Sequence, residues 1–518
     1  MKSALEVTPH LDLRQGMVDA LLYDDSGVCG ALLDCGTRIL SRAVILTTGT
    51  FLDGLVHIGL RSFPAGRAGE PPSNELSKSL ASLGIALGRF MTDTPPRLDK
   101  KSIDFSKLEI QPGDDPPAPF SFSTPSIHRP QIPCYITYTN PETHKIVLDN
   151  ILQSPVYAGK LQAPPPRYCP DIETKVIRFP DRERHQIFLE PEGRTCLEIY
   201  PNGLFTTLPE DVQIRFIQTI RGLEHARITR PAYGIEYTYA PPTQLAPTQE
   251  MRAVPGLYHA GQINGTSGYE EAAAQGILAG INAVLKVRGE EPLILHRDDA
   301  YIGVLIDDLV NKGVSEPYRM FTSRAEYRLL LRQDNADLRL MEHARRIGVI
   351  DHHQYDALLR YRDAIDKEVS RLHHSPMKTT EIDQAFLEEQ GLAPVEKSLT
   401  LAQFLSRPQV NYKHLEALGL GGALVDPRAV EQVEIAVKYA GYIHKQTGEI
   451  ERMRKMEETL LPENLDYQTI RGLTREAAEK LKERRPRTIG QASRISGVNP
   501  ADITILLIHL HKSKARDS

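Results

Sequence analysis

Cysteine is scarce in this sequence, and the residues present follow no disulfide or metal-binding spacing. There are five in 518 residues, an odd number, and no two of them form a Cys-x-x-Cys pair. These features argue against a disulfide framework and against a structural zinc site. The five are Cys29, Cys35, Cys134, Cys169 and Cys196.

Long hydrophobic runs are also absent, although 41% of the residues are apolar. No run is long enough to cross a bilayer, and residues 1–20 lack the apolar centre of a signal peptide. We therefore expect a cytoplasmic protein with no membrane partner. A chain of 518 residues is too long for one hydrophobic core, so about two to four domains are expected.

A strong excess of positive charge is missing, since the formal net charge is −5. The balance is uneven along the chain, however, because residues 465–518 hold 11 Lys and Arg against 6 Asp and Glu. A basic C-terminal region attached to an acidic body is compatible with contact to RNA.

Among the features that are present, a glycine-rich turn comes first. Leu257–Ala260 is an apolar run typical of a buried strand, and from Tyr269 apolar residues recur at helical spacing. Between them lie Gly261, Gly265 and Gly268. Such a turn lets the backbone approach a ligand closely and directs the helix N-terminus toward an anion. An ordinary strand-to-helix turn is the alternative interpretation.

A second apolar strand near the N-terminus also ends in glycine. Ala43–Leu46 runs into a Thr-Thr-Gly-Thr turn, a second place where dinucleotide folds bring backbone to a cofactor. Before it, the pattern predicts strands at Leu11–Leu13, Met17–Tyr23 and Val28–Leu33, the last two joined by a hairpin turn at Asp24–Gly27. The G-x-G-x-x-G fingerprint that opens such folds is absent before the Ala43–Leu46 strand.

Residues 64–235 hold most of the prolines and predict a loop-rich α+β insertion. Within it, Cys169 lies in Pro-Pro-Pro-Arg-Tyr-Cys-Pro, where prolines keep it out of regular structure and Arg167 supplies a positive charge that favours thiolate. A small buried hydrophobe is the alternative role for this cysteine. Three carboxylates in or next to this region are acid–base candidates or solvated groups: Glu190, Glu192 and Glu236.

The remainder of the chain predicts helices. Ser323 and Glu326 match a capping box that would open a helix. Arg324, Arg328 and Arg332 would then share one face at a spacing of four residues. This face is interpreted either as a phosphate-binding surface suited to tRNA or as a salt-bridged surface.

Residues 375–400 predict a loose helical linker, and a compact bundle is expected from Asp466 onward. Thr474 begins one helix of this bundle, and Asn499 caps a last helix that has Pro500 at its first position. The basic candidates for contact with nucleic-acid phosphates in the bundle are Lys480, Lys482, Arg484, Arg485 and Arg487.

Four strings of residues resemble a single known family. They are AGQINGTSGYEEAAAQG (260–276), PRYCPDIETKVIRF (166–179), MTDTPPRL (91–98) and IGQASRISGVNPADI (489–503). The sequence resembles the flavin-dependent tRNA uridine 5-carboxymethylaminomethyl modification enzymes, the MnmG or GidA family, over essentially the whole chain.

The resemblance implies an α/β FAD-binding Rossmann-like domain with an inserted α+β domain, followed by an all-α C-terminal region. Relative to the family, the first βαβ unit of the FAD domain, and the family's other functional cysteine with it, is missing. The implied divisions are 1–63 with 236–295 for FAD, 64–235 for NAD and substrate, 296–464 as a helical domain, and 465–518 as a bundle for tRNA and a partner GTPase.

The resemblance also implies functional residues. Cys169 is implied as catalytic. The implied FAD-binding residues are Val18, Gly49, Ser73, Gly261, Gln262 and Gly265. The implied NAD-binding residues are Pro165, Pro166, Arg167, Tyr168, Cys169, Pro170, Asp171, Ile172, Glu173, Thr174, Lys175, Val176, Ile177, Arg178 and Phe179.

The sequence departs from the family at four of the matched positions. Met91 and Asp93 replace the usual Lys and Gly, and Pro165 and Asp171 replace the usual Gly and Ser. Losing a cation and gaining an anion counts against phosphate binding near Asp93. An aspartate at a glycine position also predicts a strained turn.

The implied reaction adds a carboxymethylaminomethyl or aminomethyl group to C5 of the tRNA wobble uridine (position 34). It uses FAD, NADH, methylenetetrahydrofolate as carbon donor, and glycine or ammonium, without a catalytic metal. A homodimer would act with a GTPase of the MnmE family in a heterotetramer. Two alternatives remain: a non-catalytic tRNA- and GTPase-binding remnant, and a folate- and FAD-dependent tRNA uridine methyltransferase, against which the long helical C-terminal half argues.

The absent fingerprint predicts weak cofactor binding, because FAD is held in such folds mainly through its ADP half. We expect residues 1–518 to purify colourless and poorly soluble, and an upstream extension to restore a yellow, dimeric protein.

Overall fold

The computed structural model describes two compact units. One comprises Met1–Pro292 with Gly313–Met320, and the other comprises Leu293–Lys312 with Phe321–Ser518. In the described residues, no helix has the length and apolar composition needed to cross a membrane. The residues described are 2–168, 170–379, 383–424, 426–462 and 464–517.

The glycine-rich turn joins a strand to a helix, as the sequence predicts. β15 (Leu257–His259) pairs in parallel with β4 (Val44–Leu46). After the turn, α6 (Tyr269–Arg288) packs against β15, because Ala279 and Ala283 lie in one buried cluster with Tyr258 and Ala260. Both predicted strands and the predicted helix are confirmed.

The N-terminal region forms a three-stranded antiparallel sheet of β1 (Val18–Asp24), β2 (Gly27–Leu33) and β3 (Arg38–Leu40). The predicted hairpin turn is confirmed. The predicted strand at Leu11–Leu13 is wrong, since these residues have no regular structure and both leucines are exposed. A strand needs a partner for its backbone and a face to bury, and neither is present there. A short helix, α1 (Lys2–Glu6), precedes them.

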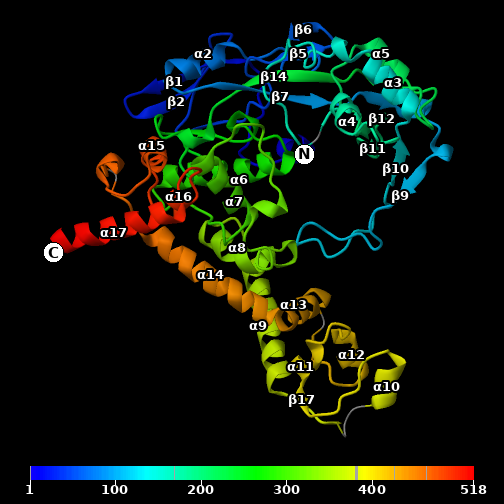
Figure 1. Ribbon diagram of the computed structural model, residues 1–518, viewed down its shortest axis with the longest axis vertical. Helices are drawn as coiled ribbons and strands as arrows, with labels where there is room; N and C mark the ends of the chain where they lie inside the picture. Colours follow the sequence, from blue (N-terminus) through cyan, green and yellow to red (C-terminus); the bar gives the residue numbers. More distant parts are fainter. Residues whose placement is uncertain (1, 169, 380–382, 425, 463, 518) are drawn as a thin grey trace. The chain divides into compact units, whose positions relative to one another are not determined.

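A four-stranded antiparallel sheet follows, with the order β6-β5-β14-β7. Figure 1 shows β5, β14 and β7 side by side in it. Its elements are β5 (Leu55–Ile58), β6 (Arg61–Pro64), β7 (Gly88–Thr94) and β14 (Tyr233–Tyr239), and α2 (Glu75–Ser82) contacts β1.

The predicted insertion holds a six-stranded sheet, and helices pack against this sheet (Figure 1). Its core joins strand residues such as Leu189 and Ile199 to helix residues such as Val147, Val176 and Phe216. The strands, in sheet order, are β13 (Ile228–Arg230), β8 (Arg97–Asp99), β12 (Glu198–Asn202), β11 (Gln186–Pro191), β10 (Cys134–Tyr138) and β9 (Glu109–Gln111). The helices are α3 (Pro141–Asp149), α4 (Ile172–Arg178) and α5 (Glu210–Ile217).

The second unit is mostly helical. It begins with α7 (Tyr301–Asp307), which continues into a π-helical turn, η6 (Asp308–Lys312). The other elements up to residue 458 are α8 (Ala336–Arg346), α9 (His352–His374), β16 (Pro376–Met377), α10 (Gln384–Glu389), β17 (Leu399–Thr400), α11 (Leu401–Leu405), α12 (Tyr412–Ala417), α13 (Pro427–Lys438) and α14 (Ala440–Glu458).

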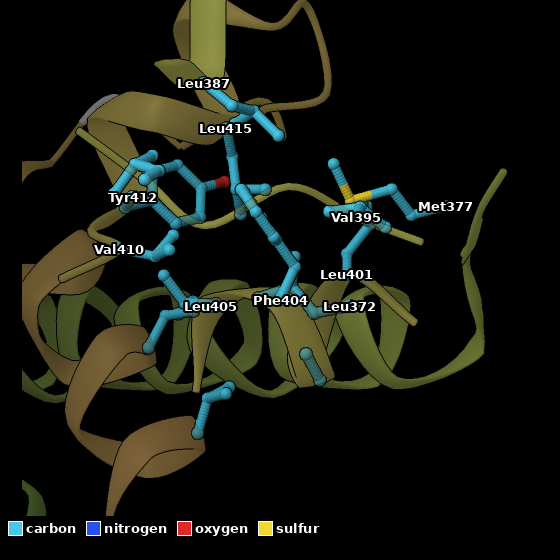
Figure 2. Close-up of a cluster of buried hydrophobic side chains, with 14 of the residues drawn as sticks. Leu372, Met377, Leu387, Val395, Leu401, Phe404, Leu405, Val410, Tyr412 and Leu415 are labelled. Carbon is cyan, nitrogen blue, oxygen red and sulfur yellow. The ribbon is translucent and has the colours of Figure 1, made fainter. Parts of the chain in front are cut away.

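The loose linker predicted at 375–400 is instead part of a hydrophobic core. Met377 and Val395 lie beside each other in it, and Leu387 is fully buried (Figure 2). Phe404 from α11 belongs to the same core. Burial of scattered apolar residues against neighbouring helices orders this stretch, although it carries little regular structure.

The capping box predicted at Ser323 is also wrong. Residues 322–324 form one short 3-10 turn, and no helix runs through 325–332. Glu326 instead pairs with the largely buried Arg297, at 2.8 Å between Oε1 and Nη2. The buried Arg297 guanidinium therefore pairs with the Glu326 carboxylate that the capping box required. Without a helix here, Arg324, Arg328 and Arg332 do not share a helical face.

The C-terminal bundle has α15 (Arg475–Arg484), α16 (Ile489–Ser493) and α17 (Pro500–Asp517). The cap at Thr474 is confirmed by its hydroxyl, which accepts a hydrogen bond from Ala477 N at 3.2 Å. Asn499 Oδ1 likewise accepts from the amides that follow Pro500, at 2.9 and 3.1 Å. These local interactions start both helices where the sequence places them.

Candidate functional site

The loop after β15 has a backbone that requires glycine. Gly261 has φ 86° and Gly265 has φ 76°, values in the left-handed region. A Cβ on Gly265 would also lie 2.8 Å from the side chain of Val314 and 2.9 Å from that of Phe90. The chain therefore turns sharply here and packs closely against its neighbours.

The loop after β4 comes close to the same place. Because β4 and β15 are parallel, their C-terminal ends meet at one edge. Gly49 has φ 55°, and a Cβ on it would lie 3.7 Å from Gln262 Oε1. Thr48 Oγ1 is buried beside Gly49 without a hydrogen-bond partner in the described residues. The structure thus brings together the predicted residues Gly49, Gly261 and Gln262.

Two further predicted residues contact each other. Ser73 Oγ donates a hydrogen bond to the carbonyl of Val18 at 3.3 Å. The amide of Ser73 donates to the carbonyl of Phe51 at 2.8 Å, and Ser73 also bridges Leu52. This segment follows Gly49 by two residues, so Val18 and Ser73 lie near the same loop.

The N-terminus of α6 carries a negative charge of its own. Glu271, in the first turn, is nearly buried, and its Oε1 accepts a hydrogen bond from Met320 N at 2.7 Å. A Cβ on Gly268 would lie 1.7 Å from Glu271 Oε2, so the carboxylate fills the space over that glycine. A carboxylate is favourable at this end of a helix. The N-terminus of α6, which the sequence predicts to face an anionic ligand, is therefore already occupied by the Glu271 carboxylate.

A buried polar network that the sequence analysis missed supports the glycine-rich loop. Asn264 Nδ2 lies 3.0 Å from the carbonyl of His259 and 2.8 Å from Gln275 Oε1. Gln275 Nε2 donates to Thr266 Oγ1 at 3.1 Å. Burial lowers the pKa of His259 to about 3, so its ring is neutral at neutral pH. These residues are scattered in sequence, and no spacing rule connects them.

The predicted NAD segment divides into an exposed loop and a partly buried helix. Cys169 lies outside the described residues. Exposed positions of this segment are Pro165, Arg167, Tyr168, Ile177, Arg178 and Phe179. Half-buried positions are Pro166, Pro170, Thr174 and Lys175, and buried positions are Asp171, Ile172, Glu173 and Val176. The four buried side chains serve packing and capping of α4.

Glu173 and Asp171 are held inside by the start of α4. Asp171 Oδ1 accepts from Thr174 N at 2.7 Å, as a helix cap. Glu173 Oε1 accepts from Thr206 Oγ1 at 2.9 Å and from Thr207 N at 3.0 Å. Burial, with the nearby Asp171 charge as a smaller cause, raises the pKa of Glu173 well above its ordinary value.

Asp93 lies in a regular strand, so the strained turn expected from its glycine position does not occur. It belongs to β7 and pairs with Gly234 of β14. Burial raises the pKa of Asp93 well above its ordinary value, and the Asp171 charge adds to this. One aspartate that departs from the family pattern, Asp171, therefore acts on the other, Asp93.

Arg167 is engaged by a partner that the sequence did not indicate. Its Nε forms an ion pair with Glu316 Oε2, and Tyr168 Oη donates to Glu316 Oε1 at 3.1 Å. The positive charge expected to favour a Cys169 thiolate is thus compensated by a carboxylate.

The three acid–base candidates all have partners. Glu236 Oε2 lies 3.1 Å from His57 Nε2, between adjacent strands. Glu192 forms an ion pair with Arg97, and Glu190 Oε1 accepts from Asn202 at 3.0 Å. These contacts link the strands of the two larger sheets to their neighbours.

The predicted tRNA-binding residues differ in how free their charges are. Arg332 is held by Asp334 at 3.0 Å and by Gln432 at 2.7 Å, and Arg324 lies 4.0 Å from Asp308. Arg328 is exposed. In the bundle, Lys480 and Arg484 contact Glu483 at 3.1 and 3.5 Å. The exposed basic positions there are Lys482, Arg485 and Arg487.

Comparison with family models identifies the chain. Residues 1–291 match the model described as glucose inhibited division protein A. Residues 352–447 match the MnmG/GidA C-terminal helical domain, and residues 449–518 match the MnmG/GidA C-terminal helical bundle. The chain belongs to the MnmG/GidA family.

Relatives within the MnmG/GidA family cover this chain from end to end. The tRNA uridine 5-carboxymethylaminomethyl modification enzyme MnmG of Geobacter sulfurreducens is 53% identical over 518 residues, which is 100% of this chain and 82% of the relative. The MnmG of Bacillus licheniformis is 50% identical over 99% of this chain and 82% of its own length. Aquifex aeolicus GidA superimposes with a TM-score of 0.88 at 44% identity, covering 98% of this chain and 81% of that one. The expected fold class is confirmed.

Proposed function

We propose that this chain is an FAD- and NADH-dependent enzyme of tRNA modification. It adds a carboxymethylaminomethyl or aminomethyl group to C5 of the wobble uridine, drawing carbon from methylenetetrahydrofolate and nitrogen from glycine or ammonium. The observation that carries the proposal is 53% identity, over the whole chain, to a relative named for this modification. The site geometry supports it through the meeting of the two glycine-containing loops.

The residues present fit FAD as a ligand held by backbone. Gly49 and Gly261 lie at adjacent strand ends with positive φ, and neither presents a Cβ to a ligand. The unpartnered Thr48 hydroxyl and the Gln262 side chain supply polar groups at the same place. The Val18–Ser73 contact lies on the neighbouring segment. When bound, FAD supplies the redox chemistry.

We assign NADH to the exposed part of the segment 165–179 and catalysis to Cys169. Tyr168 and Phe179 are exposed aromatic side chains at the two ends of this part, available to stack on a planar ring. Cys169 acts as the catalytic thiol in this proposal, which assigns it no particular step.

We assign tRNA to the basic bundle and to Arg328, and a GTPase of the MnmE family to the bundle as well. Lys482, Arg485 and Arg487 expose positive charge there, which suits phosphate contact. The working assembly is a cytoplasmic heterotetramer of a homodimer with two GTPase subunits.

The test is complementation of a bacterial strain that lacks its own MnmG. The chain is expressed alone and in an extended form that carries a strand–turn–helix segment with a G-x-G-x-x-G fingerprint before residue 1. Wobble nucleosides are then measured by mass spectrometry. We expect the extended form to restore the modified nucleoside. Absence of the nucleoside with a soluble, flavin-loaded extended form would refute the proposal.

A non-catalytic tRNA- and GTPase-binding protein is the second candidate, because the exposed bundle residues Lys482 and Arg487 suit phosphate contact without any flavin. The two candidates differ in flavin content. A scaffold binds tRNA without flavin absorbance in either form, whereas the enzyme gains a flavin spectrum when the fingerprint segment is supplied.

A further inference from the structure

One face of α14 combines glycines with exposed cations. Its members follow one another at spacings of four, three, four and three residues: Gly441, Lys445, Gly448, Arg452 and Lys455. With 3.6 residues per turn, this spacing keeps all five within about 40° of one line along the helix. The three cations are exposed. We call these five residues the glycine–cation face.

The opposite side of α14 serves the fold of its own unit. Ile450 lies about 180° from the centre of the glycine–cation face and is 8% exposed. Arg454 lies on that side too, and its guanidinium contacts Asp298 at 2.6 Å. In the described residues, Lys445 and Lys455 form no ion pair. The cations of the glycine–cation face therefore remain available to a ligand.

The two glycines leave the helix backbone open on this face. A Cβ added at Gly441 or Gly448 would meet no atom within 4 Å among the described residues. Glycine inside a helix costs about 1 kcal/mol relative to alanine, and no neighbour occupies the space that it leaves here. Arg452 Nε donates to the carbonyl of Gly448 at 3.2 Å, which holds this cation near the open backbone. A ligand can therefore approach α14 closely between its cations.

The glycine–cation face leads toward the C-terminal bundle. α14 contacts α16 of that bundle (Figure 1). Just beyond the end of α14, Leu461 N donates to the carbonyl of Arg487 at 2.8 Å, and Leu460 pairs with Thr488 in an antiparallel bridge. Arg487 is one of the exposed cations of the bundle. The cations of α14 therefore continue toward a surface already assigned to tRNA.

The chemistry of this face suits the phosphate backbone of RNA. Lys445 and Lys455 are ten residues apart, about 15 Å along the helix, which spans about four nucleotides of a stacked strand. Protein interfaces have an apolar core, whereas this face consists of glycines and cations. Beside it, Tyr442 is 66% exposed and is available to stack on a base. The carboxylates of Glu449 and Glu451 lie about 80° to either side of the face.

We propose that the glycine–cation face of α14 binds the phosphate backbone of tRNA, as a contact separate from the bundle. Lys445, Arg452 and Lys455 pair with phosphates, and Gly448 lets the strand lie against the helix backbone. The inference rests on the tRNA substrate of the proposed function. It adds a helix of the preceding helical domain to the surface that holds this substrate.

The first experiment measures tRNA binding by the full chain over a range of KCl concentrations. Lys445→Ala with Lys455→Ala should reduce the magnitude of the slope of log affinity against log salt by about 1.5, because each phosphate contact accounts for about 0.7–0.9. Lys397→Ala with Lys413→Ala is the matched control, since it removes the same charge from exposed positions outside α14. Equal slopes in the two double variants would overturn the proposal.

The second experiment leaves the charge unchanged and fills the open space. Gly448→Leu should lower tRNA affinity at least about threefold, because the new side chain keeps phosphates away from the cations. Its Tm should not fall, since leucine favours a helix more than glycine does. Thr447→Leu is the control, because this exposed residue lies about 120° from the centre of the face. Equal affinities of these two folded variants would count against the close approach and overturn the proposal.

Three further outcomes separate this contact from the proposed function. A chain that binds no tRNA at all refutes both. A chain that binds tRNA, with the α14 variants matching their controls, refutes only the α14 contact. Poly-glutamate serves as the probe for an acidic protein partner: if Lys445→Ala with Lys455→Ala weakens its binding and leaves tRNA affinity intact, the face binds protein and the proposal fails. Melting curves identify a glycine variant that does not fold, and the lysine pair then decides.

Discussion

Glu173 is a fully buried carboxyl group, and no ion pair with a cation is seen for it among the described residues. One oxygen accepts hydrogen bonds from Thr206 and Thr207, and the other has no partner in the described residues. Burial raises its pKa well above the ordinary value. The folded chain therefore binds a proton that the unfolded chain has released above about pH 4.3.

The sign of the pH dependence follows from this difference. The contribution of Glu173 to stability is fully present below its unfolded pKa and is lost as pH rises through its raised folded pKa. We expect Glu173→Gln, which keeps an oxygen acceptor for the two threonines, to remove this loss. Thermal melts across the acidic to neutral range should show the variant gaining stability relative to the unaltered chain as pH rises. A difference independent of pH would contradict the assignment.

Cys169 carries the most direct prediction about chemistry. In the flavin-loaded extended form, Cys169→Ser should abolish wobble-uridine modification while fold and flavin content stay unchanged, since only the thiol is lost. Nucleoside mass spectrometry measures the modification, and Cys134→Ser is the control because burial raises the pKa of that thiol. Unaltered modification levels in Cys169→Ser would exclude a catalytic role.

At the scale of elements, one arginine links the bundle to both α7 and α14. Arg494 follows α16, and its side chain is 10% exposed. It donates to both oxygens of Asp307 at 2.7 Å and forms an ion pair with Glu457. Arg494 therefore links three elements, and the Thr488 hydroxyl adds a hydrogen bond to Glu457 at 2.8 Å.

Arg494→Ala should destabilise this attachment by about 3 kcal/mol, because it removes two charge-assisted hydrogen bonds to Asp307 from a shielded site. Asp307 keeps Arg297 at 3.0 Å and Glu457 keeps the Thr488 hydroxyl at 2.8 Å. Amide exchange in α16 should accelerate about a hundredfold, at about 1.4 kcal/mol per tenfold. Arg475→Ala is the control, since its side chain is 94% exposed and its pair with Glu479 contributes at most about 0.5 kcal/mol. Equal exchange in the two variants would show that the contact is not stabilising.

At the scale of the whole molecule, the exposed cations of the bundle should dominate its binding of tRNA. Lys482 and Arg487 are exposed, whereas Lys480 and Arg484 contact Glu483. Replacing Lys482 and Arg487 by alanine should reduce the magnitude of the slope of log affinity against log salt by about 1.5. Each lost phosphate contact accounts for about 0.7–0.9 of this slope, and two contacts are lost. The matched double variant, Lys480→Ala with Arg484→Ala, should change the slope less. Filter binding over a range of KCl concentrations measures both.

Flavin affinity is the other property that belongs to the whole molecule. The sequence supplies the loops after β4 and β15 but no G-x-G-x-x-G turn before them. Each missing charge-assisted hydrogen bond to a pyrophosphate is worth about 1.5–3 kcal/mol. Residues 1–518 should therefore bind FAD at least about a thousandfold more weakly than the extended form. A stoichiometric flavin spectrum from residues 1–518 alone would contradict this.

Features that depend on neighbouring residues follow directly from the amino-acid sequence. The β15–glycine turn–α6 unit, the hairpin at Asp24–Gly27 and the caps at Thr474 and Asn499 all occur where the sequence predicts them. Each depends on backbone freedom at glycine or on a side chain bonding an amide two or three residues away.

The partners of the charged and buried polar groups depend on the tertiary fold. Glu326 pairs with Arg297, 29 residues away, and does not cap a helix. Arg167 forms an ion pair with Glu316, 149 residues away. Asn264 finds His259 and Gln275 inside the molecule. A buried charge or polar group must be paired with a group that the fold brings close to it. Because that group is distant in the sequence, no residue spacing identifies it.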